Sequence, residues 1–218
     1  MQLIGITSSP YVRRVAISLD LLDIPFEQVG LSTYKDFDRF KAINPVAKAP
    51  TLVCDNGQII LDSSLILQFA ERHLSAGKTL WPVEAGDYQY DMSAVSLALA
   101  ACEKAVQIVH EAQLRPEAFR FDWWLDRILQ QALAAFDLLE NEIVNRDLSV
   151  AAGNGQASLG IGQACIGISQ ACITAAVVWK FTQWAIAESV PVANFPALEN
   201  LSRRMEATPA FQKWALPS

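Results

Sequence analysis

Residues 7–15, with the sequence TSSPYVRRV, constrain the fold of this chain more than any other stretch. The β-favouring run before them predicts a short strand. Pro10 then opens an apolar pattern of period 3.6, which predicts a helix over about 10–23. Because proline suits the first helical position and serine the N-cap, Ser9 is expected at the helix N-terminus. Ser9 is then either a plain cap or a group that acts on a thiolate, which the helix dipole and free N–H groups favour there.

The remainder of the first 80 residues predicts a small α/β unit. Residues 26–31 are expected to form a second strand, parallel to the first because a helix intervenes. Two β runs within 51–61 are joined through Asn56-Gly57, which predicts a hairpin. The polar run 62–64 then supplies an N-cap for an amphipathic helix. With an irregular helix before the hairpin, the predicted order is β-α-β-α-β-β-α.

After Trp81-Pro82 the pattern changes to helices alone. Three long helices are expected, of which the last is hydrophobic nearly all round and therefore central; they cover 87–114, 122–145 and 169–187. Shorter helices are expected after Phe195-Pro196 and Thr208-Pro209. We therefore predict an α/β domain over 1–78, a linker over about 79–85 and an all-helical domain over 86–218.

One uncharged stretch, residues 148–179, could be mistaken for a membrane span. Glycines and glutamines interrupt it, and no apolar run approaches the roughly 20 residues that a bilayer requires. It is expected to be a glycine-rich loop, 153–167, that leads into a buried helix, so no membrane partner is predicted.

The composition excludes several other classes of function. Hydrophobic residues are 52% and charged residues 18%, as in a compact globular protein. The net charge of −6 arises entirely after residue 81, and no basic stripe for nucleic acid is present. Four cysteines form no metal spacing with the two histidines, so we expect no metal and reduced thiols. Because no basic segment and apolar run mark a secretory signal, a cytoplasmic location is expected.

Three motifs together make the whole chain resemble the soluble glutathione transferases. They are the run SPYVRRV at 9–15, the run NPVAKAPTLV at 44–53, and Asp62-Ser63-Ser64. The resemblance is closest to serine-type members, namely bacterial enzymes and the plant tau class. It implies a thioredoxin-like N-terminal domain followed by an all-α domain, with Pro50 cis and facing Ser9. It also implies glutathione as co-substrate and a homodimer.

The resemblance assigns roles to individual residues. Ser9 matches the serine whose hydroxyl donates to the glutathione sulfur. Ala49, before Pro50, matches the residue whose main chain pairs with the cysteinyl backbone of glutathione, as an added strand would. Asp62 and Ser63 match the pair that holds the γ-glutamyl ammonium and carboxylate. Two lysines match those near the glycyl carboxylate: Lys35 and Lys48.

The electrophile pocket is poorly specified by the sequence. Tyr11 is expected to face the cleft. On the long helix, the candidates by spacing are Glu103, Val106, Gln107 and His110, and Trp179 on the later buried helix is a weaker candidate. The chain also departs from the family, because Cys172 stands where a capping-box acid is expected three residues after Ser169. The loss of the acid's bond to the cap N–H predicts an altered or weaker helix start.

The expected function is conjugation of the glutathione thiolate to a small hydrophobic electrophile, as in detoxification. A thiol reductase of the same fold needs a nucleophilic cysteine where Ser9 stands, because a hydroxyl cannot form a mixed disulfide. A transferase-like regulatory protein that binds another protein, without conjugating activity, is the second alternative. Such proteins can lose their glutathione contacts, whereas Ser9, Pro50, Asp62 and Ser63 are all present here.

Overall fold

The computed structural model describes residues 1–146, 164–165 and 168–217. The described chain divides into two compact units. The first contains Met1–Val83, with the described parts of 156–167 and 207–218, and the second contains the described parts of 84–155 and 168–206. Most of the predicted loop 153–167 lies outside the described residues.

A four-stranded mixed sheet forms the centre of the first unit. Its strands are β1 (Gln2–Ile4), β2 (Glu27–Val29), β3 (Thr51–Val53) and β4 (Ile59–Leu61), in the order β2-β1-β3-β4. β1 and β2 are parallel, as predicted, and β3 runs antiparallel to both β1 and β4. The hairpin predicted around Asn56-Gly57 is therefore confirmed.

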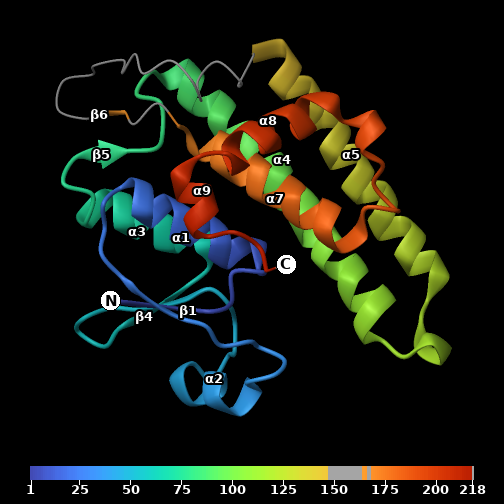
Figure 1. Cartoon of the computed structure of the whole chain (residues 1–218), viewed down its shortest axis with the longest axis horizontal. Coiled ribbons are helices and arrows are strands. Elements are labelled where there is room, and N and C mark those ends of the chain that lie inside the picture. Colours follow the sequence, from blue (N-terminus) through green and yellow to red (C-terminus); the bar gives the residue numbers. More distant parts are fainter. Residues whose placement is uncertain (147–163, 166–167, 218) are drawn as a thin grey trace. The chain divides into compact units, whose positions relative to one another are not determined.

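Helices cover both faces of this sheet. Figure 1 shows α1 (Pro10–Leu21) and α3 (Ser63–His73) on one side and α2 (Phe37–Ile43) on the other. On the α2 side, Phe40 packs with Ile4 and Leu31 in a buried cluster. On the other side, the apolar stripe of α1 predicted from the sequence is fully buried, and it includes Val12 and Val15.

Near the C-terminus, the short helix α9 (Pro209–Lys213) packs on α1. The fully buried Arg13 connects them, because its Nε donates to the carbonyl oxygen of Trp214 at 2.7 Å. The Arg13 guanidinium also lies 5.4 Å from the centre of the Phe211 ring. Phe26 stacks on Trp214 with ring centres 5.4 Å apart, so the C-terminal segment belongs to the core of this unit.

A second, two-stranded sheet was not predicted. It pairs β5 (Lys78–Thr79) with β6 (Ala164–Cys165) in parallel. Each strand has only two residues, which is too short to give an alternating pattern in the sequence.

The second unit is entirely helical in its described part. Its elements are α4 (Ala85–Val109), the π-helical turn η1 (His110–Leu114), η2 (Glu117–Phe119), α5 (Asp122–Arg146), α7 (Gln170–Ile186), η3 (Val192–Asn194) and α8 (Pro196–Glu206). α4 packs against α5 and α7, and α8 packs against α7 and α5. An edge-to-face cluster of Trp179, Phe136 and Phe195 fills the centre.

In the described residues, one helical stretch, Ala85–Leu114, is long and apolar enough to cross a membrane by length and composition alone. This is weak evidence, because core helices of water-soluble proteins pass the same test. Here α4 buries a row of small residues against its neighbours, among them Ala94, Ala98 and Ala105.

The start of α7 does not shift, although Cys172 replaces the expected acid. The helix begins at Gln170 with Ser169 as N-cap, and Ser169 Oγ accepts the Cys172 N–H at 3.4 Å. The Ser169 hydroxyl in turn donates to Cys172 Sγ at 3.7 Å. Burial raises the pKa of the Cys172 thiol to about 11, so the thiol stays neutral at physiological pH. The serine of the capping box is therefore sufficient to fix the predicted start of α7.

The fold is the predicted one: a thioredoxin-like domain with a mixed sheet, followed by a helical C-terminal domain. The domain limits predicted at 78 and 86 stay predictions.

Candidate functional site

The strand register brings the predicted site residues to one edge of the sheet. Ile4 of β1 is paired with Val29 of β2 and with Thr51 of β3, and Thr51 is paired with Leu61 of β4. β1, β2 and β4 end at this row, whereas β3 begins there. Residues 5–9, 30–35 and 62–63 therefore follow directly on this row of paired residues, and residues 48–50 directly precede it. These four segments contain all seven residues that the sequence assigned to glutathione: Ser9, Lys35, Lys48, Ala49, Pro50, Asp62 and Ser63.

Ser9 is the N-cap of α1, as predicted. Its backbone is extended, with φ −75° and ψ 121°, and its Oγ accepts the Val12 N–H at a long 3.5 Å. Within the described residues, no group accepts the hydrogen of the Ser9 hydroxyl. A hydroxyl can accept and donate at once, so capping leaves its hydrogen available to a ligand.

Ala49 and Pro50 are joined by a cis peptide bond, which confirms the prediction. Pro50 is buried and Ala49 half-buried. In the described part of the chain, neither the N–H nor the C=O of Ala49 makes a hydrogen bond. Because backbone polar groups nearly always find partners, this residue presents a free donor and acceptor at the edge of the sheet, as a strand-like ligand requires.

The loop before Pro50 is fixed by the buried Asn44. Its Nδ2 donates to Thr51 Oγ1 at 2.9 Å, and its Oδ1 accepts the Val46 N–H at 3.0 Å. The Thr51 hydroxyl donates in turn to the carbonyl oxygen of Lys48 at 2.6 Å. The loop therefore holds Ala49 in place without using the Ala49 backbone.

Gly5 lets this loop approach the start of α1 closely. It has φ 142°, and a Cβ at this position would lie 2.5 Å from Val12 Cγ2 and 3.3 Å from the Ala49 Cβ. Any larger residue would push apart the segments that carry Ser9 and Ala49. Gly5 was not predicted from the sequence, although a glycine at the end of a strand can indicate that another segment approaches closely.

Asp62 has a strained backbone at the N-terminus of α3. Its φ of 72° and ψ of 129° are unusual for a residue with a Cβ. Its Oδ1 accepts the Ser64 N–H at 2.8 Å and so caps the helix. The Nζ of Lys48 lies 3.8 Å from its other carboxylate oxygen, and both side chains are about half exposed. Strain of this kind is kept where the surroundings determine the conformation, which is common at functional sites.

Ser63 is the first residue of α3, and its side chain is buried. Its Oγ accepts a hydrogen bond at 3.2 Å from Nη1 of Arg14, which also donates to Ser64 Oγ at 3.2 Å. Arg14 lies on α1 and is itself only 2% exposed. Arg14 was not predicted as a site residue from the sequence, because arginine side chains are mostly exposed to solvent.

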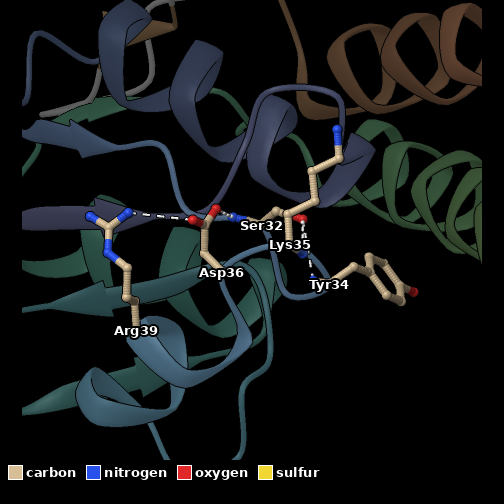
Figure 2. A network of polar contacts seen from close by, with 5 residues as sticks. All are labelled: Ser32, Tyr34, Lys35, Asp36 and Arg39. Atoms are coloured by element: carbon tan, nitrogen blue, oxygen red, sulfur yellow. Dashed lines mark hydrogen bonds and ion pairs between the residues drawn. The ribbon is translucent and has the colours of Figure 1, made fainter.

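Lys35 lies in a turn that is stabilised by its neighbours (Figure 2). Ser32 Oγ accepts the N–H groups of Tyr34 and Lys35, each at 3.2 Å. Asp36 accepts the Ser32 N–H at 3.0 Å and a bond from Arg39 Nη1 at 3.3 Å. Figure 2 shows the Lys35 side chain extending away from the Asp36 carboxylate. No described acid pairs with the Lys35 ammonium.

The proposed electrophile residues belong to different units of the chain. Tyr11 is half-buried on α1, in the first unit, while Val106 on α4 and His110 on η1 belong to the second. Burial lowers the pKa of His110. Trp179 is fully buried, and its Nε1 donates to Glu199 at 2.8 Å, so it serves the core of the second unit. The assignment of Tyr11, Val106 and His110 stays a prediction.

Among the residues that the structure describes, no group of three or more His, Cys, Asp or Glu could hold a metal ion. Cys54, Cys102 and Cys172 are free thiols. The expectation of a metal-free site stays a prediction.

The sequence of this chain is similar to a known protein family and to a bacterial relative. Residues 3–76 match the family model described as glutathione S-transferase, N-terminal domain. The chain is 27% identical over 154 residues to the uncharacterized GST-like protein YibF of Escherichia coli strain K12, covering 71% of this chain and 75% of that protein.

Two solved structures share the fold of the whole chain. One is a glutathione S-transferase from Methylobacterium radiotolerans in complex with glutathione sulfonate, with 26% identity, a TM-score of 0.77, and coverage of 100% of this chain and 96% of that one. The other is a glutathione transferase family member from Pseudomonas fluorescens Pf-5 with bound glutathione, with 21% identity, a TM-score of 0.80, and coverage of 100% and 99%.

Residues 3–76 thus match the glutathione S-transferase N-terminal domain, and a larger part of the chain is similar to GST-like proteins.

Proposed function

We propose that this protein is a serine-type glutathione transferase, similar to the bacterial and tau-class members, that adds the glutathione thiolate to a small hydrophobic electrophile. The observation that carries the proposal is the common edge of the sheet. The register of β1, β2, β3 and β4 gathers three features there: the Ser9 hydroxyl, the Ala49 backbone and the N-terminus of α3. Among the described residues, the Ser9 hydroxyl hydrogen and the N–H and C=O of Ala49 have no hydrogen-bond partner. These three features are complementary to a thiol, a peptide backbone and a carboxylate.

Ser9 would stabilise the thiolate without becoming ionised. Lowering a thiol pKa by about two units from roughly 8.5 requires about 2.7 kcal/mol. One hydrogen bond to a charged acceptor contributes about 1.5–3 kcal/mol, and the N-terminus of α1 adds to it. The hydroxyl hydrogen that has no acceptor among the described residues supports this role, and no histidine base is needed.

The two ends of glutathione would be held by charge. The N–H of Ser63, at the first position of α3, and the Ser63 hydroxyl suit the γ-glutamyl carboxylate. Asp62 suits the ammonium group, and the backbone of Ala49 would pair with the cysteinyl residue. Lys35 and Lys48 would approach the glycyl carboxylate; Lys48 would first have to leave its weak, exposed pair with Asp62.

The electrophile would bind beside Tyr11, with Val106 and His110 contributing from the helical domain. We further propose that the protein is a homodimer in the cytoplasm. Light scattering tests the dimer: a mass near twice 24.0 kDa at micromolar concentration is expected, and a monomer would contradict it.

Calorimetric titration with glutathione, followed by a conjugation assay with an aryl halide, tests the proposal directly. We expect saturable binding by the full chain and conjugation that falls about ten- to a hundredfold in Ser9→Ala at neutral pH. Binding without any conjugation across a panel of electrophiles would favour the regulatory alternative. No binding at millimolar glutathione would refute the proposal.

Ser9→Cys distinguishes the reductase chemistry. The helix N-terminus would favour a Cys thiolate, which would repel a second thiolate beside it. We expect this variant to lose conjugation and to gain disulfide exchange with glutathione, whereas the wild-type chain should lack that exchange.

A further inference from the structure

Arg14 occupies an unusual place for an arginine, because it is almost completely buried between α1 and the start of α3. It is 2% exposed, and its contacts on α3 are the hydroxyls of Ser63 and Ser64, both 3.2 Å from the same nitrogen, Nη1. A terminal guanidinium nitrogen carries two hydrogens, so one can go to each hydroxyl. The sequence motifs at the site do not account for this pair of bonds.

The direction of these bonds decides where the Ser63 hydrogen can point. Arginine has no acceptor, so Ser63 Oγ must accept from Arg14, and its own hydrogen must point elsewhere. Within the described residues, no group accepts that hydrogen. Ser63 is 3% exposed, and a buried hydroxyl donor without an acceptor is rare in native proteins. The hydroxyl is therefore oriented with a spare donor at the N-terminus of α3.

We propose that Arg14 is a positioning residue of the glutathione site, which turns the Ser63 hydroxyl so that its hydrogen is kept for the γ-glutamyl carboxylate. This inference rests on the proposed function. Arg14 does not touch the ligand; it acts through Ser63, and its charge lies one hydroxyl away from the bound carboxylate. It thereby favours a γ-glutamyl group with a free α-carboxylate over its amide.

A double-mutant cycle separates positioning from a general structural role. Glutathione dissociation constants would be measured by calorimetry for Arg14→Met, Ser63→Ala and the double variant. We expect Ser63→Ala to raise Kd about ten- to a hundredfold and Arg14→Met about three- to tenfold. Because Arg14 acts through Ser63, the double variant should match Ser63→Ala within about twofold. Turnover at saturating glutathione should stay within about threefold in Arg14→Met, since the effect lies in binding.

Two further variants serve as controls for the double-mutant cycle. Ser64→Ala removes the other hydroxyl that Arg14 contacts but leaves the Arg14–Ser63 bond, so its Kd should change less than twofold. Arg14→Lys keeps the positive charge and can still donate hydrogen bonds, so it should recover part of the affinity. It replaces Arg14→Met in the cycle if that variant does not fold. Glutathione amidated at the γ-glutamyl α-carboxylate should bind more weakly than glutathione to the wild type. The ratio of the two Kd values should be smaller for Arg14→Met, which keeps the α3 N-terminus but lacks the oriented hydroxyl.

Additive effects of Arg14 and Ser63 variants on Kd would overturn the inference, while the proposed function would stand. An unchanged preference for the free carboxylate in Arg14→Met would overturn it equally. Wild-type chain that fails to bind glutathione would instead refute the proposed function.

Discussion

Replacing Asp62 by glycine and, separately, by alanine would distinguish the cost of its backbone conformation from the role of its carboxylate. With φ at 72° and ψ at 129°, a residue with a Cβ pays about 1–3 kcal/mol, whereas glycine pays almost none. The carboxylate offsets part of this cost by accepting the Ser64 N–H at 2.8 Å. Such a cap stabilises a protein by about 1 kcal/mol relative to alanine, but by only a few tenths relative to glycine.

The two variants should therefore differ in stability. Asp62→Ala loses the cap and keeps the strain, so its free energy of unfolding should fall by about 1 kcal/mol. Asp62→Gly loses about 0.5–1 kcal/mol to the greater freedom of the unfolded chain but is relieved of the strain. It should be as stable as the wild type, or up to about 2 kcal/mol more stable. Urea unfolding at constant m-value measures both differences.

Glutathione affinity should not follow this order, because both variants lose the same carboxylate. A half-exposed contact with the γ-glutamyl ammonium contributes about 1–2 kcal/mol, so Kd should rise roughly five- to thirtyfold in both. Asp38→Ala, which removes an exposed acid on α2, serves as the control and should leave Kd unchanged. A lower free energy of unfolding for Asp62→Gly than for Asp62→Ala would refute the strain argument. Wild-type glutathione affinity in both variants would show that Asp62 does not belong to the site.

Three further changes test the supports of the fold. Asn44→Ala removes the buried bonds to Thr51 and Val46 and should lower the free energy of unfolding by about 1–3 kcal/mol; a loss below about 0.5 kcal/mol in urea would contradict this. Arg13→Met removes the bond to the Trp214 carbonyl and should speed amide exchange across 209–217 about tenfold without affecting α3; unchanged protection would show that α9 is held otherwise. The Phe121 N–H and Arg115 hold the pKa of Glu111 below its ordinary value of 4.5, so its stabilisation is present above pH 4.5 and is lost as the pH falls further, through the lowered pKa. The gap in unfolding free energy between wild type and Glu111→Gln should therefore narrow once the pH is lowered below 4.5, and a gap that stays constant there would contradict it.

Local signals in the sequence were sufficient for most of the fold. Ser9 and Pro10 at the start of α1, the Asn56-Gly57 turn and the polar run 62–64 at the start of α3 each act within a few residues. Each marks an element boundary that the structure confirms. The long helices followed from their apolar periodicity. The end of α4 differs, because the chain continues as the π-helical turn η1. There the buried Glu111 accepts the Phe121 N–H at 3.0 Å, a contact ten residues away that no local pattern encodes.

The arrangement of the site was harder to predict from the sequence, because it also depends on contacts between residues far apart in the chain. The resemblance could name Ser9, Ala49 and Ser63, but their grouping depends on strand register. The burial of Arg14 depends on how α1 packs against α3. Likewise, the positive φ of Asp62 arises from the turn between β4 and α3 rather than from a preference of aspartate for that conformation.

The pKa of the bound glutathione thiol tests the central claim most directly. Thiolate absorbance would be titrated in the binary complex of the wild type, Ser9→Ala and Ser8→Ala, with each chain saturated with glutathione. We predict a thiol pKa about two units below roughly 8.5 in the wild type and in Ser8→Ala, and a pKa about one to two units higher in Ser9→Ala. A Ser9→Ala complex whose thiol titrates as in the wild type would show that Ser9 only caps α1, and would contradict the account.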